Sequence, residues 1–209
     1  DVYKRQVYNG VPVEKYKLED VTRFESPVTR MLLAGRISVQ KGQMDAIKAV
    51  ELLMQRGIDT VLLTLVGQGE TNEYLEYVKS YVKEHELEQK ICILEHHDDL
   101  RELRRQCDIG LTCSKKEAFG RVTVENMLAK MLVIGANTGG TLEIVEDGYN
   151  GLLYEEGNPE SLAGRIEYAM EHKMDMQILL DRGYLDSINR FSSTTLIESI
   201  LNLYKKIIF

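Results

Sequence analysis

The order in which short apolar runs and longer helical patterns follow each other restricts what this chain can fold into. Short runs rich in apolar and β-branched residues alternate with segments whose apolar residues recur at helical spacing. We expect strands at residues 28–34, 61–66, 91–94, 109–113, 132–136 and 151–154. Strands that alternate with helices form right-handed βαβ units, and their parallel sheet is covered by helices on both faces. The sequence therefore predicts an α/β fold with a doubly wound parallel sheet.

The intervals between these runs carry the helical patterns. Expected helices span residues 43–56, 74–85, 98–106, 122–130, 141–146 and 161–171, with two more behind them. No further strand follows these last two helices. We therefore expect residues 171–209 to pack elsewhere, toward a second domain.

Size and charge exclude several classes of protein. The 209 residues, 44% of them hydrophobic, suffice for one domain with a sizeable core but not for two. A protein that binds duplex nucleic acid needs a basic stripe, whereas this chain has a formal net charge of −7. Its small basic cluster of Arg101, Arg104 and Arg105 is interpreted as one solvated face of a helix.

Apolar runs are too short to cross a bilayer, and no signal peptide is recognisable. Cys92, Cys107 and Cys113 lie in or beside apolar runs without metal-ligand spacing, so we expect buried thiols in a reducing cytosol. His96 and His97 are adjacent and lack further ligands at matching spacing. A solvated loop or the wall of a base pocket explains them better than a metal site, and we expect no metal.

The beginning of the chain is unusual. Residues 1–6 resemble a translated sequencing adapter, and the chain does not start with Met. We therefore expect residues 1–6 to be an artefact and the gene to extend upstream, with the α/β domain in residues 7–170.

Ligands of doubly wound sheets bind beyond the carboxyl ends of the strands, so the loops that follow each strand carry the candidate site. In the first loop, Gly35 ends a strand and Gly42 opens a helix, with Arg36 and Lys41 between them. A guanidinium and an ammonium at this edge suit a diphosphate. Two solvated surface charges are the alternative interpretation.

Two other loops are rich in glycine. Gly67 and Gly69 follow the second strand and permit a ligand to approach the backbone closely, although a plain turn has the same pattern. Gly139 and Gly140 precede a helix, where backbone N–H groups can bind an anion or a sugar hydroxyl. A tight strand-to-helix turn is the alternative for this second pair.

The loop after the fourth strand carries two carboxylates. Glu117 lies in the loop, Glu125 lies about one turn into the next helix, and Gly120 between them lets the chain pass close to a ligand. Carboxylates accept hydrogen bonds from the hydroxyls of a polyol such as a sugar or a ribose. A surface Glu together with a Glu that supports the first helical turn is the alternative.

The order of these motifs resembles the C-terminal domain of family-4 retaining glycosyltransferases, which have the GT-B fold of two Rossmann-like domains. The likeness covers nearly all of residues 7–209, and Glu117 and Glu125 match the E-x7-E element of that family. The motifs that carry it are Gly35-Arg36, Lys41-Gly42, Val66-Gly67-Gln68-Gly69, Glu117-Ala118-Phe119-Gly120, Thr138-Gly139-Gly140 and Asp147-Gly148-Tyr149-Asn150-Gly151. The chain departs from the family at Asn126, where alanine is usual, in the run Lys130-Met131-Leu132-Val133, where Gly-x-Pro-Val is usual, and at Glu95, where glycine is more frequent.

The resemblance implies a site for a nucleoside-diphosphate sugar that works without a metal or other cofactor. Arg36 and Lys41 would hold the diphosphate, Glu125 the ribose and Glu117 the donor sugar, so that Arg36, Lys41 and Glu117 would be the catalytic residues. The donor site would be completed by Gly35, Gly67, Gly69, Leu94, Phe119, Gly120, Arg121 and Val122.

The implied function is that of a hexosyltransferase fragment that acts in the synthesis of cell-envelope polysaccharide. Its partners would be the sugar donor and a glycan or lipid-linked acceptor, and residues 171–209 would pack toward the acceptor domain. We expect the chain alone to be inactive, and its full-length protein to be cytoplasmic and peripheral to the inner face of the membrane. A non-catalytic nucleotide-sugar-binding module and a nucleotide-sugar epimerase of similar architecture are the alternatives.

Overall fold

A computed structural model of the chain describes residues 7–94 and 99–208, with only the backbone described for residues 207 and 208. It contains one six-stranded sheet in the order β3-β2-β1-β4-β5-β6, and every neighbouring pair is parallel. The strands are β1 (Thr29–Ala34), β2 (Val61–Val66), β3 (Ile91–Leu94), β4 (Ile109–Thr112), β5 (Leu132–Ala136) and β6 (Leu152–Tyr154). The α/β fold with a doubly wound parallel sheet is thus confirmed.

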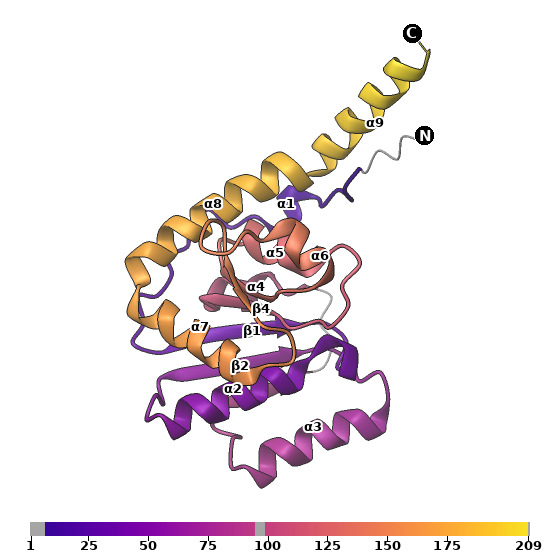
Figure 1. Cartoon of the computed structure of the whole chain (residues 1–209). Coiled ribbons are helices and arrows are strands. Elements are labelled where there is room, and N and C mark those ends of the chain that lie inside the picture. The colour runs from indigo at the N-terminus through magenta and orange to yellow at the C-terminus, as the bar shows by residue number, and fades with distance from the viewer. Residues whose placement is uncertain (1–6, 95–98, 209) are drawn as a thin grey trace.

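Helices cover both faces of the sheet (Figure 1). Those expected from the sequence are α2 (Gln43–Gln55), α3 (Asn72–Glu84), α4 (Arg101–Gln106), α5 (Arg121–Leu128), α6 (Gly139–Ile144), α7 (Pro159–Glu171), α8 (Lys173–Phe191) and α9 (Ser193–Ile208). Two short helices were not expected, namely α1 (Val13–Tyr16) and the 3-10 helix η1 (Val39–Lys41).

The core lies on both sides of the central strands. Ile47 and Leu53 of α2 and Ile166 of α7 are buried in one cluster with alternate residues of β1 and β2. On the other side, Val124 and Leu128 of α5 belong to a second cluster that also contains residues of β5 and the end of α8. Burial on both faces explains why the strand sequences are continuously apolar instead of alternating.

The strand order reverses between β1 and β4. The chain runs outward from β1 through β2 to β3, then returns to β4 beside β1 and runs outward again through β5 to β6. At such a switch point, the loops that leave two adjacent strands diverge and form a crevice. The loops at 35–42 and 113–120 meet there, because the backbone N–H of Lys115 donates to the carbonyl of Gln40 at 2.9 Å.

The two C-terminal helices behave differently. Helix α8 packs against α5 and β5 of this same domain, and the expectation that it also packs toward a second domain stays a prediction. Helix α9 extends away from the body of the domain (Figure 1), and its first residue donates a backbone hydrogen bond to the carbonyl of Val11. It exposes Ile197, Leu201 and Tyr204, so the expectation that it packs toward another domain stays a prediction.

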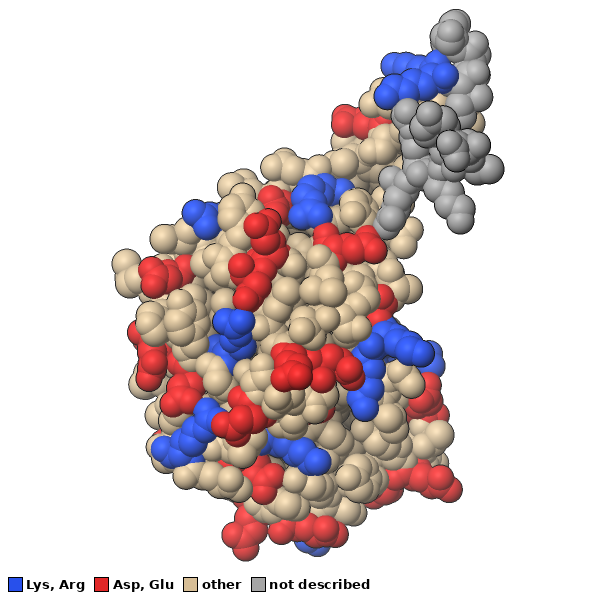
Figure 2. Space-filling view, in the orientation of Figure 1, with Lys and Arg blue, Asp and Glu red and all other residues tan. Residues whose placement is uncertain are grey.

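The surface carries both signs of charge. On the face shown in Figure 2, Lys and Arg side chains are interspersed with Asp and Glu, and no continuous basic stripe crosses it. Within the described part of the chain, no helix is both long enough and apolar enough to traverse a bilayer.

The cysteines follow the sequence interpretation only in part. Cys107 and Cys113 are buried, and burial raises the pKa of each thiol to about 12. Cys92, in contrast, is exposed. It lies on β3, an edge strand of the sheet, where a side chain in an apolar run can still be exposed to solvent.

Candidate functional site

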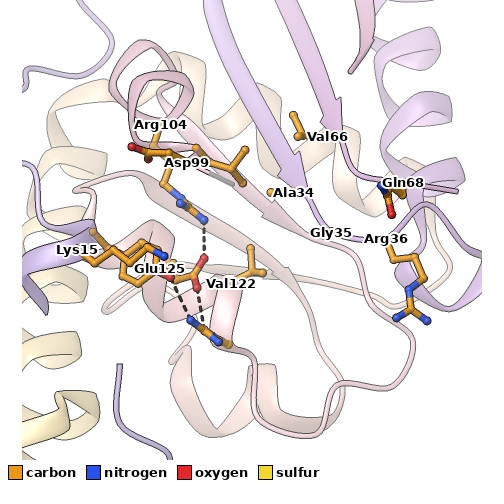
Figure 3. Close-up of a pocket in the computed structure, with 13 residues that line it drawn as sticks. Lys15, Ala34, Gly35, Arg36, Val66, Gln68, Asp99, Arg104, Val122 and Glu125 are labelled. Atoms are coloured by element: carbon orange, nitrogen blue, oxygen red, sulfur yellow. Dashed lines mark hydrogen bonds and ion pairs between the residues drawn. The ribbon is translucent and has the colours of Figure 1, made fainter. Parts of the chain in front are cut away.

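A cleft of about 490 Å³ opens at the carboxyl edge of β1 and β2, at the switch point (Figure 3). Its walls come from the loops after β1 and β2, the N-terminal parts of α4 and α5, and α1. The lining residues are Lys15, Tyr16, Ala34, Gly35, Arg36, Val66, Gln68, Asp99, Leu100, Arg104, Arg121, Val122 and Glu125. The cleft therefore collects five of the residues predicted from the sequence, namely Gly35, Arg36, Arg121, Val122 and Glu125.

Arg36 lies at the rim of this cleft. Its Nη1 is 3.4 Å from Oε1 of Glu70, and two thirds of its side chain is exposed. In Figure 3 its guanidinium points away from Glu125. An exposed ion pair of this kind contributes at most about 1 kcal/mol, so the arginine can leave Glu70 for a stronger anion at low cost.

Lys41 and Glu117 come from the loops after β1 and β4, and they form a direct ion pair. The Lys41 Nζ lies 2.7 Å from Oε2 of Glu117, and both side chains are partly exposed, at 33% and 22%. Both line a narrow space next to the main cleft, and Val122 lines both spaces. The convergence of these two loops, on which the sequence interpretation depends, is thus present.

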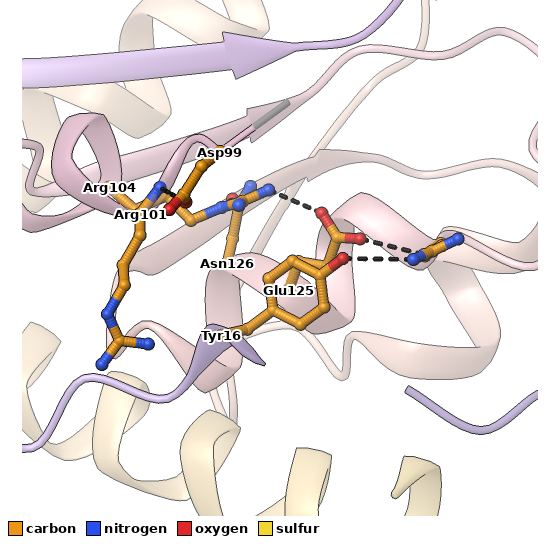
Figure 4. Close-up of polar contacts among 7 residues, drawn as sticks. Tyr16, Asp99, Arg101, Arg104, Glu125 and Asn126 are labelled. Atoms are coloured by element: carbon orange, nitrogen blue, oxygen red, sulfur yellow. Dashed lines mark hydrogen bonds and ion pairs between the residues drawn. The ribbon is translucent and has the colours of Figure 1, made fainter. Parts of the chain in front are cut away.

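Glu125 lies at the centre of a polar network (Figure 4). Its Oε2 accepts a hydrogen bond from Nη2 of Arg104 at 2.6 Å, and its Oε1 accepts one from Nε of Arg121 at 3.0 Å. Arg121 also donates to the hydroxyl of Tyr16 at 3.1 Å. The hydrogen bond to Tyr16 and the charge of Glu125 raise the pKa of Arg121. The network joins α1, α4 and α5.

Arg104 corrects the sequence interpretation. We expected Arg101, Arg104 and Arg105 to form a solvated face, but the side chain of Arg104 is only 3% exposed. Burial lowers the pKa of its guanidinium, and the Glu125 carboxylate opposes that shift. The other two arginines reach backbone carbonyls at the surface. A buried charge is tolerated here because a carboxylate of opposite sign meets it.

Sequence reasoning missed Lys15, Tyr16, Asp99 and Arg104. Lys15 and Tyr16 lie on the four-residue helix α1, which is too short for a detectable helical period. Asp99 lies just before the short helix α4, and Arg104 lies within it. The only available signal was the number of charges around residues 99–105, and it does not distinguish a buried charge from an exposed one.

Gly67 and Gly69 line an adjoining space of about 450 Å³ together with Leu94. The structure also explains these glycines without a ligand. A Cβ at Gly67 would overlap the carbonyl oxygen of Gly35, and a Cβ at Gly69 would lie 2.9 Å from that of Leu75. The loops after β1 and β2 therefore need both glycines to pack together.

Gly139 and Gly140 hold the loop of Glu117. The backbone N–H of Gly140 donates to the carbonyl of Glu117 at 2.7 Å, and a Cβ at Gly139 would lie 2.6 Å from the same oxygen. The expected anion-binding group of N–H donors is therefore used inside the protein, at least at Gly140. This glycine pair packs against the loop of Glu117 and helps to hold it in place.

Phe119 and Gly120 differ in their surroundings. Phe119 packs against Tyr8 and Phe191, with ring centroids 6.5 Å and 5.9 Å away, so its side chain anchors the loop. Gly120 lines the narrow space with Lys41 and precedes α5 at φ 89°, a conformation that favours glycine. Only its backbone can contribute to a site.

Some predictions fall on residues 95–98. Glu95, His96 and His97 lie outside the described residues. Among the residues that are described, no group of three or more His, Cys, Asp or Glu side chains is arranged to hold a metal ion.

Comparison with known proteins supplies the family. The model of the family "Glycosyl transferases group 1" matches residues 16–184. This chain belongs to that family. An uncharacterized glycosyltransferase of Methanocaldococcus jannaschii is 33% identical over 165 residues, which cover 77% of this glycosyl transferase chain and 42% of the relative. The capsular polysaccharide biosynthesis glycosyltransferase CapM of Staphylococcus aureus is 22% identical, with 94% of this chain and 52% of CapM covered.

Solved structures show the same architecture. The crystal structure of Anabaena HepE in complex with UDP has a TM-score of 0.87 at 26% identity, and the match covers 96% of this chain and 57% of HepE. The C-terminal domain of a group 1 glycosyl transferase from Francisella tularensis is covered completely, with a TM-score of 0.77 at 22% identity, which shows the shared fold. The glycosyl transferase chain thus has the Rossmann-like fold of GT-B enzymes. It spans about half the length of the curated relatives it matches.

Proposed function

We propose that this chain is the donor-binding domain of a retaining hexosyltransferase and that its cleft binds a nucleoside-diphosphate sugar. The ion pair between Lys41 and Glu117 beside the Glu125 cleft is the observation that carries the proposal. A cation from the loop after β1 shares one sheet edge with a carboxylate for the sugar and a carboxylate for the ribose, which both follow β4.

The charges around the cleft support an anionic ligand. Lys15, Arg36, Arg104 and Arg121 line it, against Asp99 and Glu125. The cleft is therefore locally positive, in a chain whose formal net charge is −7. A local excess of positive charge in an acidic protein favours a phosphate-bearing ligand over a neutral one.

In the proposed complex, the diphosphate takes over cations that now pair with carboxylates. Lys41 breaks its ion pair with Glu117 or keeps it while it also contacts a phosphate, and Arg36 turns from Glu70 toward the phosphates. Both ion pairs are partly exposed, so each contributes at most about 1 kcal/mol to stability. A charge-assisted contact with a diphosphate contributes more than that to binding. The N-terminus of α5, after Gly120, adds a favourable dipole for the anion.

Glu125 would accept hydrogen bonds from the ribose hydroxyls, and Glu117 would accept them from the donor sugar. Gly67, Gly69 and Leu94 would flank the base and ribose. HepE was crystallised with UDP and with UDP-glucose, which supports this class of ligand for the present chain.

The chemistry follows from charge development. When the glycosidic bond breaks, negative charge grows on the leaving diphosphate, and fixed cations stabilise it more in the transition state than in the ground state. The proposed transfer therefore needs no metal. It proceeds with retention of the anomeric configuration, to a glycan or lipid-linked acceptor bound outside the described domain. Relatives in capsule and lipopolysaccharide synthesis support such an acceptor.

Titration with a panel of UDP-, GDP- and ADP-sugars tests the proposal. We expect at least one to raise the melting temperature, because a ligand at 100 times its Kd adds about 2.7 kcal/mol to the free energy of unfolding. Lys41→Ala should reduce this shift. Lys83→Ala, an exposed lysine on α3 away from the cleft, should not. If no nucleotide sugar shifts the melting temperature, the proposal fails.

A further inference from the structure

Arg104 is the most deeply buried charged side chain of the cleft, and its contacts are specific. Its Nη2 donates to Oε2 of Glu125 at 2.6 Å, and its Nε donates to Oδ1 of Asn126 at 3.2 Å. The ring of Tyr16 lies against its guanidinium, with a distance of 5.3 Å from Cζ to the ring centroid. The guanidinium is thus held by three side chains from two other elements.

This arrangement fixes the orientation of Glu125. The planar guanidinium presents its donors in a rigid fork, so one arginine contacts two consecutive side chains of α5, and neither can rotate without losing a bond. Figure 4 shows Arg104 reaching Oε2 of Glu125. The other oxygen, Oε1, accepts a hydrogen bond from Nε of Arg121. Arg121 is 63% exposed, so the buried Arg104 is the more rigid of the two supports.

Glu125 keeps acceptor capacity for a ligand. A carboxylate offers about four lone-pair sites. The two arginines take one hydrogen bond on each oxygen, which leaves roughly one further site on each. Glu125 and Arg104 both line the cleft, and Figure 3 shows the guanidinium of Arg104 reaching the carboxylate there.

The sequence also makes room for this support. A Cβ at Gly110 on β4 would lie 2.6 Å from Cγ and 2.8 Å from Cβ of Asn126. Only a glycine at this position therefore lets Asn126 adopt the position from which its oxygen reaches Arg104. Gly110, Asn126 and Arg104 form one supporting unit behind Glu125.

We propose that Arg104 is a positioning residue, which holds the Glu125 carboxylate in the orientation that the vicinal hydroxyls of a ribose require. It does not touch the ligand's reacting atoms. This inference rests on the proposed nucleotide-binding function. It adds a mechanism by which the site distinguishes a ribonucleotide from a nucleotide without ribose hydroxyls.

The test compares ligands with and without these hydroxyls. The Kd of the chain for UDP, GDP and ADP is measured by calorimetry, together with the Kd of each 2′,3′-dideoxy counterpart. We expect Arg104→Met to weaken the ribonucleoside diphosphate that binds best about tenfold, the scale of one charge-assisted hydrogen bond. Binding of its dideoxy counterpart should change by less than about twofold. If Arg104 had a merely structural role, Arg104→Met would weaken the binding of both ligands equally, and that result overturns the proposal.

Three variants make the comparison robust. Arg105→Met is the matched control, because Arg105 lies on the same helix but is exposed, and it should change neither affinity. Arg104→Lys keeps the buried charge and protects against a failure to fold. Because lysine lacks the fork, it should still lower the ratio of ribo to dideoxy affinity by about threefold or more. In a Glu125→Gln background, Arg104→Lys should have no further effect on this ratio.

The outcomes separate this inference from the proposed function. An unchanged affinity ratio in Arg104→Lys overturns the role of Arg104, while binding of the nucleotide by the unaltered chain leaves the proposed function intact. Equal affinity of the unaltered chain for ribo and dideoxy ligands also overturns it. If none of the three nucleoside diphosphates binds, the proposed function itself fails, and this inference fails with it.

Discussion

The two glutamates of the site lie eight positions apart in the chain, but their surroundings differ. Glu117 lies in a loop and pairs with the partly exposed Lys41. Glu125 lies on α5, is largely buried, and is held by Arg104 and Arg121. The first carboxylate has one exchangeable partner, whereas the second has two partners that secure its orientation.

This difference teaches how one site can combine adaptability with rigidity. A partly exposed ion pair contributes little to stability, so a ligand can replace it at low cost. A buried pair is expensive to break, because the charge that stays behind is poorly solvated. We infer that Lys41 and Glu117 reorganise when the donor binds, and that Glu125 does not.

The first effect, of about the same size as the one that follows it, should separate the two pairs by stability. Arg104→Met leaves the buried Glu125 with Arg121 alone, so we expect the free energy of unfolding to fall by about 3 kcal/mol. Lys41→Met should lower it by less than about 1 kcal/mol. Urea unfolding followed by circular dichroism measures both. Equal losses in the two variants would contradict the comparison.

The next effect concerns catalysis, where the loss of Lys41 should have a large effect although its loss has little effect on stability. In a transferase that joins this domain to its acceptor-binding half, we expect Lys41→Ala to reduce kcat by 10²–10³, which is about 2.7–4 kcal/mol. The physical reason is the loss of a cation directed at the leaving diphosphate. Lys83→Ala serves as the control. If Lys41→Ala keeps the kcat of the unaltered enzyme, Lys41 has no catalytic role.

A smaller effect sharpens the buried half of the comparison. Gly110→Ala would push a Cβ against Asn126, the second partner of Arg104, and should cost about 1–3 kcal/mol. Gly164→Ala is the matched control, because Gly164 lies within α7 and a Cβ there meets nothing within 4 Å. That change should instead stabilise the chain by about 0.5–1 kcal/mol. Thermal unfolding of the two variants should show a lower melting temperature for Gly110→Ala and a higher one for Gly164→Ala.

The smallest effect should come from salt. Raising NaCl from about 0.05 to 0.5 M shortens the Debye length to well under 10 Å and screens exposed charges. The small stability loss of Lys41→Met should therefore vanish at high salt, whereas that of Arg104→Met should persist. A loss that disappears for both variants would show that Arg104 is not shielded from solvent.

Much of the fold could be predicted from local patterns. The strands β2, β3 and β5 have the bounds expected from their apolar runs, and the other strands differ by one residue at an end. The ends of these strands then indicated which loops lie at the binding edge. The meeting of Lys41 with Glu117 followed from that topology, because parallel strands share their carboxyl edge.

Other features had no local signal. Helix α4 has six residues, too few for a clear apolar face, so nothing distinguished Arg104 from its exposed neighbour Arg105. The cover on Arg104 comes from Tyr16, far away in the sequence. Likewise, the glycines at 139 and 140 suggested a ligand, whereas the carbonyl of Glu117 uses the N–H of Gly140.

The sequence by itself determined the alternation of strands and helices, the loops that carry the polar residues and the family to which they point. These depend on apolar periodicity and on short motifs, which are local properties of the chain. Only the tertiary structure decided which charges are buried, which glycines make room for neighbouring backbone, and which partner each carboxylate has. Burial and pairing depend on contacts between residues that are distant in sequence, and a charge has the same letter whether water or another side chain surrounds it.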